Sequence, residues 1–170
     1  MSTLAWVAVA WFSNCIVTAL RAHGGFGYVM PDSGIIVIAY LALRRDALQV
    51  VMVALIAGYL IGRQDLAPTG LYPLTLGTVA LGTQLIAGSL AGSGPAFGAL
   101  VTAAASAAYH ALTFALLFGT RGTAGFANWW TAVLFPNALL TAFFGLLALP
   151  LFNALEKRLT ADTHTALSWR

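Results

Sequence analysis

Long apolar runs, separated by short clusters of charged residues, follow one another along the whole chain. A helical run of about 20 apolar residues is long enough to cross a lipid bilayer. We therefore expect an all-α integral membrane protein with spans at residues 4–20, 33–43, 47–62, 71–87, 95–118 and 129–155. This pattern predicts a six-helix transmembrane domain over residues 1–158, followed by a short polar cytoplasmic tail at 159–170.

The second apolar run, residues 33–43, is short for a span, at about 11 residues. Either it begins earlier, near Phe26, or it lies half-buried within the bundle. If it forms a hairpin with residues 47–62 that does not fully cross, the number of spans falls from six to five. The first run lacks the basic start of a signal peptide, so we expect it to stay as a retained span.

Composition supports a membrane setting, since 60% of the 170 residues are apolar and 8% are charged. A soluble domain carries about 25% charged residues, so these charges are too sparse to cover a water-facing surface. The net charge of +3 comes from residues in loops between the spans. It therefore indicates contact with the lipid bilayer and no nucleic-acid partner.

The distribution of Lys and Arg predicts the orientation, because these residues gather in cytoplasmic loops. With the N-terminus inside, five basic residues face the cytoplasm, namely Arg44, Arg45, Lys157, Arg158 and Arg170. Three face outward, namely Arg21, Arg63 and Arg121. We therefore expect a multi-pass protein with both termini in the cytoplasm.

Small residues recur at helical spacing, which allows close approach between membrane helices. The fifth run carries an alanine ladder of Ala99, Ala103, Ala107, Ala111 and Ala115, and the third carries Gly58 and Gly62. These positions are candidate helix interfaces. One interpretation is packing within the chain, and the other is docking of a partner's transmembrane helix.

His110 is the ionisable residue that lies deep in a predicted span, and such residues are functional candidates. No acidic residue falls within a predicted span. We therefore expect a neutral His110 that bonds a neighbouring helix, with a proton or ligand role as the alternative. Asn137 and Thr141, four residues apart, are further candidates for hydrogen bonds between helices. No catalytic set, metal site or cofactor motif is evident, so we expect a protein that is not an enzyme.

Charged residues at the ends of the predicted spans have simple structural interpretations. Asp32 follows Pro31 and is expected to cap the helix after it. Asp65 is expected to cap a helix or to pair with Arg63. Arg44 and Arg45 are expected to anchor the topology.

The order of several motifs resembles the bacterial rod-shape-determining MreD family. The matching stretches cover about residues 30–90 and 130–158, and they include Pro31, Asp32, Arg44, Arg45, Asp65, Gly70, Pro136 and Asn137. The resemblance implies a non-enzymatic subunit of the cell-elongation complex in the bacterial cytoplasmic (inner) membrane.

Such a subunit would bind the single transmembrane helix of the MreC scaffold. It would thereby help to link peptidoglycan synthases, RodA and its transpeptidase, to MreB filaments. The family is thought to share the six-helix fold of the vitamin-binding S components of energy-coupling-factor transporters. An S component is therefore the alternative function. Against it, the Ala-x-x-x-Ala pair expected on the first helix of an S component is missing, since Val9, Phe12 and Asn14 follow Ala5, Ala8 and Ala10 at that spacing.

Overall fold

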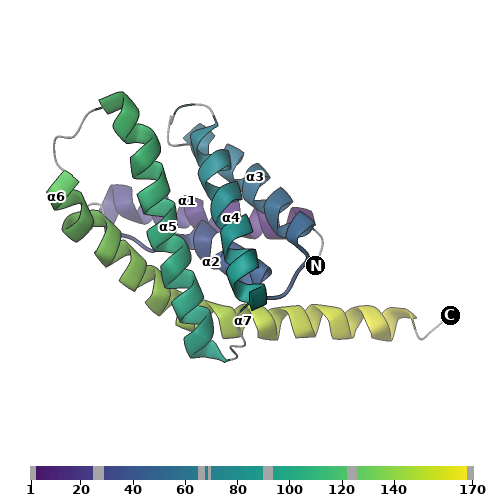
Figure 1. The fold of residues 1–170 in the computed structure, drawn as a ribbon. Helices are drawn as coiled ribbons and strands as arrows, with labels where there is room; N and C mark the ends of the chain where they lie inside the picture. The colour runs from purple at the N-terminus through teal and green to yellow at the C-terminus, as the bar shows by residue number, and fades with distance from the viewer. Residues whose placement is uncertain are drawn as a thin grey trace.

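The protein is a bundle of helices (Figure 1), seen in a computed structural model that describes residues 3–24, 29–64, 68, 70–89, 94–121 and 126–167. The helices are α1 (Thr3–Gly24), α2 (Ser33–Ala42), α3 (Ala47–Gln64), α4 (Leu71–Ser89), α5 (Pro95–Arg121), α6 (Phe126–Trp129), the π-helical turn η1 (Trp130–Leu134) and α7 (Phe135–Leu167). The described residues contain no strand. The predicted all-α class is therefore confirmed.

Five helices, α1, α3, α4, α5 and α7, are long and apolar enough to cross a membrane, and α2 is a shorter apolar helix. The chain is therefore a multi-pass membrane protein. Large apolar side chains on the outer surface are exposed, as expected where lipid replaces water, and they include Leu4, Leu48, Leu74, Leu85, Leu100 and Leu139. At about 1.5 Å per residue, the ten residues of α2 extend only about 15 Å, half of a bilayer core.

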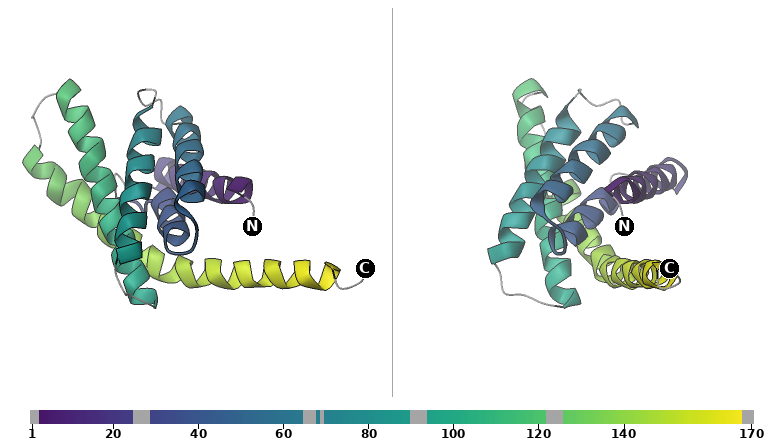
Figure 2. Two further views of the ribbon diagram at one scale, coloured as in Figure 1. Left: turned by 45° about the vertical axis from the view of Figure 1, so that its right-hand side comes forward. Right: turned by 90° about the vertical axis from the view of Figure 1, so that its right-hand side faces the viewer.

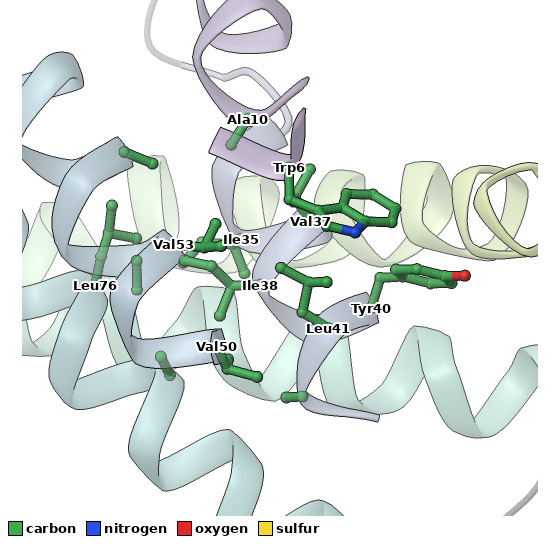
Figure 3. Close-up of a cluster of buried hydrophobic side chains, with 14 of the residues drawn as sticks. Trp6, Ala10, Ile35, Val37, Ile38, Tyr40, Leu41, Val50, Val53 and Leu76 are labelled. Carbon is green, nitrogen blue, oxygen red and sulfur yellow. The ribbon is translucent and has the colours of Figure 1, made fainter. Parts of the chain in front are cut away.

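The short helix α2 lies at the centre of the molecule. Its residues from Gly34 to Ala42 are all buried, and α1, α3, α4, α5 and α7 all contact it. A helix that is apolar on every side is stable when other helices surround it. Figure 3 shows Trp6 of α1 and Val50 of α3 among the side chains packed against it. The helix of the second apolar run thus begins at Ser33, and not near Phe26. Its residues from Gly34 to Ala42 are buried, so the expectation of a half-buried helix is corrected.

The surrounding helices are not all parallel. In Figure 2, α3 and α4 run side by side, α5 crosses α4 in the right-hand view, and α1 lies steeply across α3. The C-terminal half of α7 extends away from the rest of the bundle. Because α7 continues to Leu167, most of the predicted tail after residue 158 is helical.

A glycine pair brings α3 and α4 together. A Cβ atom added at Gly58 would lie 2.8 Å from Pro73 Cα and 2.9 Å from the Tyr72 carbonyl oxygen. One added at Gly62 would lie 3.3 Å from the Tyr72 ring. Both glycines therefore occupy an interface within the chain, where only a missing side chain permits this approach of the two backbones.

The last predicted span, residues 129–155, is not one continuous α-helix, because a π-helical turn lies just before Pro136. Pro136 is the second residue of α7, directly after the wide π-helical turn that ends at Leu134. Proline has no amide hydrogen and its ring clashes with the carbonyl four residues earlier, so a widened turn before it relieves both problems. Pro150 lies in the interior of α7, and this helix bends along its length in Figure 1.

Candidate functional site: a polar cluster and cavity at the start of α2

The segment that leads into α2 is attached to α7 by two backbone amides. Met30 N donates to Asn137 Oδ1 at 2.9 Å, and Asp32 N donates to Thr141 Oγ1 at 2.9 Å. Asn137 and Thr141 lie one turn apart on α7 and are both buried. Pro31, between the two bonded residues, has no amide hydrogen to satisfy. Asn137 and Thr141 were expected to bond a neighbouring helix; they do bond another part of the chain, but their partners lie in the non-helical segment before α2.

The carboxylate of Asp32 collects three donors from two other helices. Its Oδ2 accepts hydrogen bonds from Ser106 Oγ and from Thr141 Oγ1, the latter at 3.4 Å, and it lies 3.0 Å from His110 Nε2. Ser106 and His110 are four residues apart on α5, so both face the same neighbour. The Asp32 and His110 side chains are only 17% and 14% exposed. A carboxylate removed from water requires such partners, because burying an unpaired charge is costly.

This cluster corrects two expectations. Asp32 does occupy the N-cap position of α2, but its side chain makes no capping hydrogen bond. His110 was expected to lack an acidic partner, yet Asp32 lies against it. The error came from assigning Asp32 to a loop outside the spans, whereas the short α2 places it at the depth of the middle of α5.

The geometry of the cluster differs from that of a nucleophile activated by a base. Ser106 and His110 both contact the same carboxylate oxygen. A catalytic serine would instead donate to the imidazole, which would in turn be oriented by the carboxylate. The cluster therefore holds three helices together through one oxygen atom and does not activate Ser106. Among the described residues, no group of three or more His, Cys, Asp or Glu side chains is placed to bind a metal ion.

A cavity of about 160 Å³ adjoins the cluster on the side of α1. Side chains from α1 to α5 line it, and they include Asn14, Arg21, Asp32, Ile61, Tyr109 and His110. Ser33 and Thr113 also line it, and their hydroxyl oxygens are buried without a hydrogen-bond partner. The cavity is thus polar in chemistry although it lies among apolar helices.

A second polar cluster lies at the opposite end of α2. Tyr40 Oη donates to Glu156 Oε2 at 2.6 Å, and Arg45 forms an ion pair with the other oxygen of Glu156. Gln84 Nε2 donates to the Arg45 carbonyl oxygen at 3.0 Å, which joins α4 to this end. Arg44 lies over the Tyr40 ring, 5.8 Å from its centroid. Besides any effect on topology, Arg45 therefore attaches the end of α2 to α7 and α4, whereas Arg44 packs on Tyr40 of α2 itself.

An apolar groove of about 480 Å³ runs between α4 and α5. Most of its α5 wall consists of small side chains, namely Ala104, Ala105, Ala108 and Ala111. The larger Val101 and Leu112 lie at the two ends of this stretch of sequence. Of the alanine ladder identified in the sequence, only Ala111 lines this groove. Ala99, Ala103 and Ala107 are half-buried beside it, and Ala115 is exposed.

The remaining residues of the resemblance are spread over the bundle. Gly70 precedes α4 with a φ of +92°, a conformation that favours glycine. Asp32 and Asn137 take part in the two bonds between α7 and the segment before α2, and Pro31 lies between the two bonded residues of that segment. Asp65 lies outside the described residues.

No protein-family model, curated protein or solved structure matches the chain. The contacts within the chain itself are therefore what bears on its function.

Proposed function

We propose that the chain is a non-enzymatic membrane scaffold subunit that holds the transmembrane helix of a partner in the groove between α4 and α5. The observation that carries this proposal is the row of small side chains along the α5 wall of the groove. Lipid gives no hydrophobic drive for helix association, so membrane helices associate where small residues let their backbones approach. Here Ala104 and Ala108 are exposed, and no helix of the described chain fills the 480 Å³ beside them.

The resemblance to the MreD family suggests which partner this is. We propose the single transmembrane helix of an MreC-type scaffold, with the chain acting in the bacterial cell-elongation complex beside MreB filaments and peptidoglycan synthases. Two residues that carry the resemblance take part in neighbouring bonds between α7 and the segment before α2, since Met30 bonds Asn137 and Asp32 bonds Thr141, and this supports the proposal. A scaffold also accords with a serine, histidine and aspartate arranged for packing and not for catalysis.

The alternative, a vitamin-binding subunit of a transporter, is less well supported by the cavity. Pockets for ligands of drug size measure about 300–1,000 Å³. The polar cavity beside Asp32 measures about 160 Å³. It is therefore small for a whole vitamin.

Filling the groove tests the scaffold proposal. We expect Ala108→Leu to reduce co-purification of full-length MreC with the chain in detergent by at least about fivefold, because overpacking an interface costs about 1–3 kcal/mol. Ala154→Leu, an equal change at an exposed alanine of α7, is the matched control and should leave capture unchanged. Equal capture by the two variants, or no capture by the unaltered chain, would contradict the proposal.

A further inference from the structure

The cavity beside Asp32 has more polar groups than the packing of the chain uses. The buried hydroxyl oxygens of Ser33 and Thr113 have no hydrogen-bond partner among the residues that the structure describes. Asp32 bonds its neighbours through Oδ2. Its Oδ1 has no partner among the described residues and, unlike the two hydroxyls, is not fully buried. Buried polar groups are nearly always bonded, and in a membrane no bulk water compensates for a missing bond. These three groups line one cavity, so a single bound molecule would satisfy them together.

The charges around the cavity have opposite signs. Arg21, near the end of α1, is an exposed lining residue, whereas Asp32 is largely buried among α5 and α7. His110 also lines the cavity and contacts the Asp32 carboxylate, and the phenols of Tyr72 and Tyr109 are the further titratable groups of the lining. The cavity therefore offers a cationic group at an exposed position and an anionic oxygen at a buried one.

The remaining walls are mainly apolar or aromatic, apart from the polar side chains of Asn14 and Thr18 on α1. Ile35, Ile61 and Leu76 come from α2, α3 and α4, and the rings of Tyr72 and Tyr109 stack at 6.3 Å. An engineered protein cavity of about 150 Å³ holds one benzene molecule, so about 160 Å³ suits a ligand of roughly six to ten non-hydrogen atoms. Its body would be apolar and its two ends charged.

We propose that this cavity binds a small zwitterion of the size of an aliphatic amino acid. The ammonium group bonds Asp32 Oδ1 and the hydroxyls of Ser33 and Thr113, and the carboxylate pairs with Arg21. Charge-assisted bonds of this kind are about twice as strong as neutral ones. His110, Ser106 and Thr141 hold the Asp32 carboxylate in place through its other oxygen, Oδ2. This site does not depend on the groove between α4 and α5.

Three probes of one shape test the site. L-Leucine carries both charges, 3-methylbutylamine carries only the ammonium group, and 4-methylpentanoate carries only the carboxylate. We expect calorimetry on the purified full chain in detergent to show binding of L-leucine, and at least tenfold weaker binding of the other two. No binding of L-leucine at up to about 10 mM, beyond the range of weak ligands, would overturn the proposal. Equal binding of either single-charge probe would also overturn it.

Substitutions inside and outside the cavity test whether L-leucine binds there. We expect Asp32→Asn and Arg21→Gln each to weaken L-leucine binding at least tenfold. Asp46→Asn and Arg63→Gln remove the same charges outside the cavity and should leave binding unchanged. Thr113→Val removes a hydroxyl that has no partner in the described part of the chain, so it should keep the melting temperature and still weaken binding. If Thr113→Val and both charge variants bind like the unaltered chain, the assigned site is wrong. The assay contains no MreC, so its failure is separate from a failure of the scaffold proposal.

Discussion

Asn137 is a buried amide whose oxygen accepts the Met30 amide across 107 residues of sequence. We expect Asn137→Ala to lower the free energy of unfolding by about 1–3 kcal/mol, because the buried Met30 amide would lose its partner. Unfolding of the purified chain in mixed detergent micelles measures this change. Asn153→Ala removes a half-buried amide of the same helix, and it should cost less. Equal losses in the two variants would show that the Met30 bond contributes nothing.

His110 and Asp32 show what residue-level analysis of a sequence captures. The histidine was identifiable because an ionisable group within a long apolar run is unusual. Its partner was not, because Asp32 lies 78 residues earlier, and it was placed in a loop beside Pro31. Contacts between distant residues depend on how deep each helix lies. In this chain that depth follows from the shortness of α2.

The hairpin of α3 and α4 depends on the backbone contact at Gly58. We expect Gly58→Ala to destabilise the bundle by about 1–3 kcal/mol, because the added methyl group would lie 2.8 Å from the backbone of Pro73. Thermal unfolding in detergent measures this loss.

Gly88 offers the matched control within α4. A Cβ atom added there meets no atom within 4 Å, so Gly88→Ala should be neutral or should stabilise by up to about 1 kcal/mol through helix propensity. Destabilisation of both variants to the same extent would mean that the close approach at Gly58 is not what makes glycine necessary.

The positions of the long helices followed from the apolar runs, although α7 begins only after the π-helical turn and continues to Leu167. The faces of α5 did not follow from the sequence. Successive alanines four residues apart turn by about 40° per step around a helix of 3.6 residues per turn. From Ala99 to Ala115 the ladder therefore turns by about 160° and leaves the face where it began. The groove follows alternating steps of three and four residues, from Val101 to Leu112. A regular repeat in the sequence was thus a poor guide to one continuous face.

Taken as a whole, the molecule has five long apolar helices and one short central helix. Alone, α2 extends about 15 Å, and the segment before it turns at Asp32, where Ser33 N donates to the Pro31 carbonyl oxygen at 3.0 Å. This segment therefore adds less than about 13 Å, the length of four extended residues, and the total falls short of the roughly 30 Å of a bilayer core, a mismatch that local thinning of the bilayer can accommodate. Non-helical backbone is tolerated at that depth where protein surrounds it, as Asn137 and Thr141 do here.

We therefore expect α2 and the segment before it to complete a sixth crossing, which places both termini on the same side of the membrane. Reporter proteins fused separately to the N-terminus and the C-terminus measure this, since some are active only in the cytoplasm and others only outside it. Both fusions should report the cytoplasm, as the distribution of Arg and Lys predicts. Termini on opposite sides would show that α2 does not cross.

The bond between Met30 and Asn137 also has a consequence for biosynthesis. A ribosome adds about 5–20 residues per second, so Asn137 is made about 5–20 s after Met30. During that interval α2 is too short to stay in the bilayer alone, and its leading amides have no partner. Until α7 is synthesised, α2 and the segment before it are therefore kept in the membrane only by their packing against the longer helices α1, α3, α4 and α5. A slow or failed insertion of α7 would leave the centre of the protein open to proteolysis.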